Sequence, residues 1–443
     1  MTEARAERRH EVLVEGLFRR ESAKLIASLA RILGPSNIDL AEDLVQETLA
    51  SALTAWSSAL PDKPEAWLMK VARNRAIDAV RSQGTQRRFA AEYARELASG
   101  WTRSMTVEES LAAERADENM LRMMLSLCHP ALASETHITL ILKFLCGLGR
   151  RELAAAFLTS EDTIKKRLAR GRAKFRELGS LPPLDETVED RLPSVLNALY
   201  LLFNEGYHGS NPVVPARAVL CQEAMQLCDL IIRTAERPAA SAHGLMALMC
   251  FHSARLESRF DADGQAVPLA RQDRATWDRG LIDSGIAHLG RSAQGRALSP
   301  YHLEAGIAYK HCLAPSFEET DWPGILELYD LLFRIDASPL VAVLRAVVRA
   351  HAGDPAAAVA ELAPLEGNPA LAGYPFYWAS RAEVHALNGD PDQAHADLAR
   401  ATELARSRVE VEAFQRRLEE LATLSAADPD TRTEATGPKG RAP

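Results

Sequence analysis

The chain has 443 residues, 47% of them hydrophobic, which suits roughly two to four packed domains. No apolar run approaches the roughly 18 residues of a membrane span, and the charged start MTEARAERRHE does not resemble a signal peptide. Six cysteines without C-x-x-C spacing favour buried, reduced thiols over a metal site. We therefore expect a cytoplasmic protein without metal or cofactor.

The charge is distributed unevenly along the chain. Residues 1–180 carry 28 Lys and Arg against 24 Asp and Glu, a net charge of +4, and the rest carries a net charge of −12. The first part is the candidate for nucleic-acid binding. The acidic part should avoid bare phosphate unless it has local basic patches.

Apolar residues recur at helical spacing throughout, and alternating β-branched runs are missing, which predicts an all-α fold. Helices over about 5–33 end at the breaker Gly-Pro-Ser-Asn of residues 34–37. Asp39 is then expected to cap the next helix, with Glu42 three residues on in the spacing of a capping box. In that helix the expected buried residues are Leu40, Leu44, Leu49, Leu53 and Trp56, and the expected exposed ones are Asp43, Gln46 and Glu47.

A further helix starts at Pro64, a favoured first helical position for proline, and carries a polar, basic stripe. The stripe consists of Lys70, Arg73, Asn74 and Arg81, and the opposite side holds the apolar Leu68, Val71, Ala72, Ala76, Ala79 and Val80. Cations beside a loop and a tryptophan suit single-stranded DNA, whose backbone is followed by charge and whose bases stack on aromatic rings. Trp67 is either a base contact or a core residue.

The segment RRELAAAFLTSEDTIKKRLARGRAKFRE, residues 150–177, is typical of a helix-turn-helix. Ser160 is the natural N-cap of its second helix. Thr163, Lys165, Lys166, Arg167 and Arg170 are expected to face a DNA groove, and Arg172, Lys174 and Arg176 to face phosphates. Leu158 occupies the turn position where glycine is common, so the turn is expected to adopt another geometry.

Two stretches beyond the Leu181-Pro182-Pro183 boundary repeat at an offset of 36 residues, RAVVRAHAGDPAAAVAEL at 345–362 and RAEVHALNGDPDQAHADL at 381–398. In each copy a glycine ends one helix and Asp-Pro starts the next. The period is close to the roughly 34 residues of tetratricopeptide repeats, so degenerate copies are expected upstream.

The polar cluster RLESRFDADGQAVPLARQDRATW could suggest a ligand or metal site. It contains Arg255, Arg259, Asp261, Asp263, Gln272, Asp273 and Arg274, but lacks the glutamate that would complete a calcium loop. We favour structural ion pairs between packed helices. No set of catalytic residues can be identified, so we do not expect an enzyme.

AEDLVQETLASAL followed by WLMKVARNRAIDAVR resembles region 2 of bacterial RNA polymerase sigma factors of the extracytoplasmic-function (ECF) type. TIKKRLARGRAKFR resembles their region 4. RLPSVLNALYLLFNEGY, RQDRATWDRGLI and TDWPGILELYDLL resemble the long C-terminal extension of one subgroup. The resemblance implies a region 2 domain at 1–82, a linker at 83–110, a region 4 domain at 111–180, a TPR-like helical extension at 184–425 and a disordered tail at 426–443.

The resemblance also implies partners and sites. Core RNA polymerase would be bound through its β′ clamp helices, by Asp43, Leu44, Gln46 and Glu47, and through its β flap. The promoter −10 element would be bound by Trp67, Lys70, Arg73, Asn74 and Arg81. The −35 element would be bound by Ser160, Thr163, Lys165, Lys166, Arg167, Arg170, Arg172 and Lys174. A further protein would bind the extension.

A polymerase-independent helix-turn-helix regulator with a helical sensor domain is the alternative function. A helical-repeat scaffold with incidental basic helices is a third.

Overall fold

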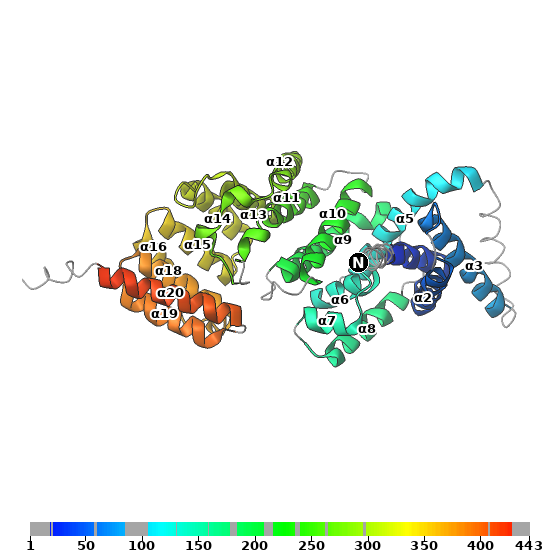
Figure 1. Ribbon diagram of the computed structural model, residues 1–443, viewed down its shortest axis with the longest axis horizontal. Coiled ribbons are helices and arrows are strands. Elements are labelled where there is room, and N and C mark those ends of the chain that lie inside the picture. The colour runs from blue at the N-terminus through cyan, green and yellow to red at the C-terminus, as the bar shows by residue number, and fades with distance from the viewer. Residues whose placement is uncertain are drawn as a thin grey trace, which may run out of the picture. The chain divides into compact units, whose positions relative to one another are not determined.

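The computed structural model describes residues 18, 21–56, 60–84, 105–129, 131–157, 159–177, 184–207, 216–234, 240–261, 265–295, 298–405 and 408–427. Within these ranges every regular element is a helix, and the only β pairing is an isolated bridge between Phe260 and Ala266, so the expected all-α fold is confirmed (Figure 1). The chain divides into two compact units, Met1–Gly206 with Arg217–Pro238, and Tyr207–Ala216 with Ala239–Pro443.

The first unit holds the segments expected to bind DNA. After helical residues 21–33, its elements are η1 (Pro35–Asn37), α2 (Ile38–Ala55), α3 (Pro64–Gly84), α5 (Met105–Leu127), α6 (Ser134–Phe144), α7 (Arg150–Ala156), α8 (Glu161–Arg176), most of α9 (Leu184–Tyr207) and α10 (Ala216–Thr234). Most of the expected linker, the turn residue Leu158 and the expected tail beyond residue 427 lie outside the described residues.

Helix α2 starts two residues earlier than a cap at Asp39 would require. Asn37 is its N-cap and makes no side-chain bond to the helix, while its Nδ2 atom donates to the Leu33 carbonyl at 2.6 Å. Asp39 therefore lies in the first turn of α2, and the expected capping box was wrong. Asp39 and Glu42 bind basic side chains of α6 and α8 instead, as described below.

Helices α9 and α10 pack with the first unit. The Arg191 guanidinium donates to the Leu125 carbonyl of α5 at 3.2 Å, and Arg233 pairs with Asp117 of α5 at 3.1 Å. The division between the units therefore falls after α10, rather than at the Leu181-Pro182-Pro183 boundary considered above.

The second unit consists of successive helix pairs. Its elements are α11 (Ala240–Ala254), the short turns η2 (Glu257–Arg259), η3 (Leu269–Arg271) and η4 (Arg274–Thr276), then α12 (Arg279–Ser292), α13 (Pro300–Leu313), α14 (Trp322–Ile335), α15 (Pro339–His351), α16 (Pro355–Leu362), η5 (Ala363–Leu365), α17 (Pro369–Ala372), α18 (Pro375–Leu387), α19 (Pro391–Leu404) and α20 (Arg408–Ala427). The pairs α11–α12 and α13–α14 precede the two sequence repeats.

The local features of the 36-residue repeat are confirmed. Gly353 and Gly389 have φ angles of 100° and 76°, a left-handed conformation that glycine adopts without steric cost. Asp354 and Asp390 each cap the following helix by accepting a backbone amide at 3.1 Å. The repeat therefore fixes the same helix–turn–helix geometry twice.

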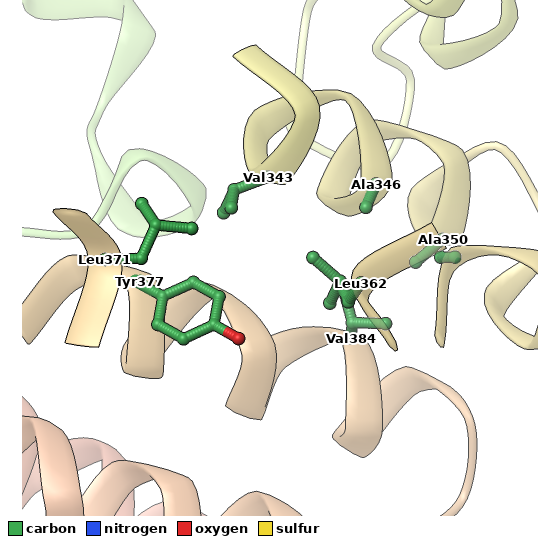
Figure 2. Close-up of a cluster of buried hydrophobic side chains, with 8 residues drawn as sticks. Val343, Ala346, Ala350, Leu362, Leu371, Tyr377 and Val384 are labelled. Atoms are coloured by element: carbon green, nitrogen blue, oxygen red, sulfur yellow. The ribbon is translucent and has the colours of Figure 1, made fainter. Parts of the chain in front are cut away.

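A buried apolar cluster holds the first repeat against the second. Figure 2 shows Val343, Ala346 and Ala350 of α15 facing Leu362, Leu371, Tyr377 and Val384, which come from α16, α17 and α18. Burial of a Val or Leu side chain contributes roughly 1.5–3 kcal/mol, and an alanine methyl contributes less, so this cluster is a main source of stability for the second unit.

The polar cluster at 255–277 is organised by backbone contacts. Arg274 Nη1 donates to the carbonyls of His311 and Ala314, the latter at 2.8 Å, at the end of α13. Asp261 and Asp273 accept the amides of Gln265 and Ala275 at 2.8 and 2.9 Å. For Arg274 and Asp273, the expected side-chain ion pairs are thus replaced by bonds to the backbone, and Asp263 lies outside the described residues.

All six cysteines are buried and free of disulfide bonds, as the sequence predicted. None of the helices that the structure describes is long and apolar enough to cross a membrane.

Candidate nucleic-acid interface

The segment expected to form a helix-turn-helix contains α7 and α8, and α8 begins where the sequence predicted. The Ser160 hydroxyl accepts the Thr163 amide at 3.2 Å, which caps α8. Ile164, Leu168 and Phe175 are buried along one side of the helix. These contacts fix which side of α8 remains for a ligand.

A close approach of α8 to α6 depends on Gly171, a residue that the sequence did not single out. A Cβ atom at this position would lie 2.6 Å from side-chain carbons of Leu140 in α6. Glycine therefore sets the distance between these two helices.

The exposed side of α8 is strongly basic. Lys165, Lys166 and Arg170 are exposed, and none of them forms an ion pair with the part of the chain that the structure describes. Thr163 is half-buried, as is Arg167, whose guanidinium lies 5.5 Å from the centre of the Phe157 ring. Unneutralised cations on one exposed helix face suit the phosphate backbone of a duplex.

The C-terminal part of α8 has a different role from the one expected. Arg172 is half-buried and pairs with both Asp39 and Glu42 of α2, the latter at 2.7 Å. Lys143 of α6 also pairs with Glu42 at 2.7 Å, and Arg176 lies 3.5 Å from Asp39. We call this five-residue network the α2–α8 ion cluster.

Arg172 and Lys174 were expected to face DNA phosphates, but each forms an ion pair with an acidic side chain of the first unit. Arg172 is held inside the first unit, and Lys174 pairs with Glu177 at 2.7 Å. Sequence reasoning missed the cluster because its two acids precede Arg172 by 130 or more residues, and no local pattern joins them.

Helix α3 presents the polar stripe expected for single-stranded DNA. Lys70 and Asn74 are exposed, Arg73 is half-buried, and Arg81 lies 3.9 Å from Asp78 on the same helix. On the opposite side Leu68, Ala72 and Ala76 are fully buried, Val71 and Ala79 are half-buried, and the side chain of Val80 lies outside the described part of the chain. The division of α3 into a buried and a polar face therefore follows the sequence prediction.

The sequence left open whether Trp67 is a core residue or a base contact, and in the structure its ring is partly packed and partly accessible. Its ring is half-buried and meets the Trp56 ring edge-on, with 5.3 Å between centroids. Trp56 is buried, with Phe18 at 5.6 Å. Trp67 thus packs against the core and retains an accessible part.

The outer face of α2 carries Asp43, Gln46 and Glu47, all exposed as expected. Leu44 is 7% exposed and supports the helix from the core side, so it is not available as a surface contact. Leu53, which was expected to be buried, is 59% exposed and extends the same outer face. Glu47 pairs with Arg75 of α3 at 2.6 Å, so it also joins the two helices.

Comparisons with known proteins agree with this arrangement. The family model Sigma-70 region 2 matches residues 17–86, which include α2 and α3. A family of unknown function, DUF6596, matches residues 191–293. An uncharacterized protein of Rhizobium meliloti (strain 1021) is 35% identical over 407 residues, which cover 90% of this chain and 93% of that protein. No solved structure matches significantly.

The region 2 domain implies binding to core RNA polymerase and to promoter DNA, and it supports a sigma-factor-like role in transcription initiation. The chain belongs to the same family as the Rhizobium meliloti protein, and its N-terminal domain is a sigma-70 region 2.

Proposed function

We propose that the protein is an ECF-type sigma factor that directs core RNA polymerase to promoters. The outer face of α2 binds the β′ clamp helices, the polar stripe of α3 holds the opened −10 element, and α8 reads the −35 element. The nucleotide chemistry belongs to the polymerase, and the sigma factor contributes binding and strand capture.

The observation that carries this proposal is the combination of a region 2 match with an exposed, unneutralised basic face on α8. A capped helix with cations on one side and a packed apolar side is the geometry that enters a major groove. An autonomous regulator would need the basic face of α8, but it would not need a sigma-70 region 2 domain.

The outer face of α2 offers a specific test of polymerase binding. The double variant Asp43→Arg with Leu53→Ser reverses a charge and removes an apolar contact at two exposed positions. We expect it to lose co-purification with core polymerase and promoter-dependent transcription, while circular dichroism remains helical. The pair avoids Glu47, because reversing that charge would also break its bond to Arg75.

Glu327→Arg is the matched control, since Glu327 is an exposed acid of α14 in the second unit. It should retain both polymerase binding and transcription. Full transcription by the double variant would contradict the docking face, and promoter binding without polymerase would favour the autonomous regulator.

We further propose that the acidic C-terminal extension regulates the sigma core. An acidic segment tethered to a basic one can compete with DNA, because the tether makes the contact effectively intramolecular. The same transcription assay tests this with a chain truncated after Pro238, which keeps α9 and α10 with the unit that they pack against. Promoter activity should change by on the order of fivefold or more while polymerase binding persists, and unchanged activity would contradict regulation.

A further inference from the structure

Four buried nitrogen atoms of the second unit gather where α11 and α13 end. They are Arg255 Nε, Arg274 Nη2, Trp277 Nε1 and His311 Nδ1, and none has a hydrogen-bond partner among the described residues. Arginine and tryptophan nitrogens are obligate donors, and a neutral histidine can donate from Nδ1. A buried donor left without an acceptor is costly, because it has lost its bond to water without replacing it, so four together call for an acceptor. We call these residues the four-donor cluster.

Backbone contacts bring the four residues to one place. The amide of Asp278 donates to the Ala254 carbonyl at 2.9 Å, which sets Trp277 beside Arg255. The Arg274 guanidinium lies 5.1 Å from the centre of the Trp277 ring, and its Nη1 atom donates to the His311 carbonyl. The cluster is therefore held by the fold and does not depend on flexible surface side chains.

The two acids nearest to Arg274 and Trp277 in sequence are engaged elsewhere. Asp273 accepts the Ala275 amide at 2.9 Å, and Asp278 accepts the Leu281 amide at 3.0 Å as the N-cap of α12. Glu318 affects Arg274 electrostatically, but it is exposed and its carboxylate bonds to Ser316. Neither Arg255 nor Arg274 forms an ion pair within the described ranges, so both positive charges remain unneutralised.

The charge of the cluster resides on the two arginines. Burial, together with Arg255 and Arg274, lowers the pKa of His311 to about 4, so its ring is neutral near pH 7. Burial and the nearby Arg255 charge both lower the pKa of Arg274, so the two guanidinium groups lie within electrostatic range of each other. They repel each other unless an anion lies between them, and each offers several donors to such an anion.

From this geometry we propose that the four-donor cluster binds a tetrahedral oxyanion, a free phosphate or the phosphate group of a small molecule. Donors from α13 and from two segments of the 255–277 stretch suit a ligand with several acceptor oxygens better than a planar carboxylate with two. The surrounding part of the chain has a net charge of −12, which disfavours long polyanions such as nucleic acid but not a small anion held by buried donors. The three donors other than His311 lie within the family match of unknown function at 191–293.

Inorganic phosphate is the probe for the test, titrated into the full-length protein by calorimetry at constant ionic strength. We expect saturable binding at one site per chain and a higher unfolding temperature in phosphate than in chloride. Arg255→Gln should weaken binding by at least about tenfold, the scale expected for losing a charge-assisted hydrogen bond. Arg255→Lys, which keeps the charge but lacks the forked donors, should bind with intermediate affinity. Arg274 is left unchanged because it also holds the end of α13.

Two further variants separate a site from general charge. Trp277→Phe removes one donor and keeps an aromatic ring, and it should weaken binding several-fold. Arg334→Gln removes an exposed arginine of α14 and should bind like the wild type. The proposal is overturned if phosphate does not bind saturably, if acetate binds better than phosphate, or if Arg255→Gln and Arg334→Gln behave alike. Because polymerase and DNA are absent from the assay, its outcome is independent of the sigma-factor proposal.

Discussion

Helix α8 of the first unit and the repeat helices of the second are both rich in arginine, but they use it in opposite ways. On α8 the exposed Lys165, Lys166 and Arg170 have no acidic partner among the described residues. In the repeats, Arg345 pairs with Glu361, and Arg381 pairs with Asp397 at 2.6 Å. Both repeat pairs join residues 16 positions apart, so the ion pair itself is repeated.

This difference separates charges that hold the protein together from charges kept for a partner. Asp397 is 2% exposed, and a buried carboxylate is tolerated only when it is paired and hydrogen-bonded. Exposed cations contribute little to stability and are screened by salt. The pairing state of an arginine therefore indicates its role more clearly than its position in an arginine-rich segment does.

The largest expected effect on stability is that of Arg381→Ala. Removing the guanidinium leaves the buried Asp397 carboxylate with a bond from Gln393 Nε2 at 3.1 Å and with His385 Nε2 at 4.0 Å, but without its arginine partner. We expect a loss of about 3–5 kcal/mol in the free energy of unfolding, measured by urea denaturation. Arg400→Ala, which breaks an exposed pair with Glu403, is the control and should be nearly neutral. Equal losses in the two variants would contradict the distinction between structural and partner charges.

The α2–α8 ion cluster should show an intermediate effect. Glu42→Ala leaves Lys143 and Arg172 without their shared carboxylate, and we expect a loss of about 1–3 kcal/mol on unfolding. The same change removes one negative charge beside Arg172 and leaves Asp39 as its remaining acidic partner, so the affinity for nonspecific duplex DNA should rise. Glu177→Ala, which removes an exposed partner of Lys174, should leave stability nearly unchanged. A stable Glu42→Ala protein with unaltered DNA affinity would show that the cluster constrains neither property.

The smallest effect on stability is expected on the exposed face of α8. Lys165→Ala, Lys166→Ala and Arg170→Ala should each change the free energy of unfolding by less than about 0.5 kcal/mol. Each should weaken DNA binding and lower the slope of log affinity against log salt by roughly 1 if the residue contacts a phosphate. Salt titrations of binding to promoter and random duplexes measure this. Unaltered slopes in all three variants would exclude this face as the phosphate contact.

Much of the local structure could be predicted from the sequence. Ser160 as an N-cap, the left-handed glycines at 353 and 389 and the Asp-Pro helix starts depend on contacts within about four residues, which the sequence displays directly. Helical periodicity likewise predicted which sides of α2 and α3 face solvent, except at Leu53.

Long-range contacts could not be predicted in this way. Asp39 was expected to cap a helix, yet its carboxylate pairs with Arg172, which is 133 residues away. The approach of α8 to α6 at Gly171 and the gathering of the four-donor cluster also depend on segments distant in the chain.

The sequence by itself determined the helices, the caps at Ser160 and at the two Asp-Pro starts, most exposed faces and the resemblance to sigma region 2. Only the tertiary structure decided which of the many charged residues neutralise each other and which are left for a partner. The physical reason is that a cap or a turn is a local property of the backbone, whereas the pairing and desolvation of a charge depend on which distant segments pack beside it.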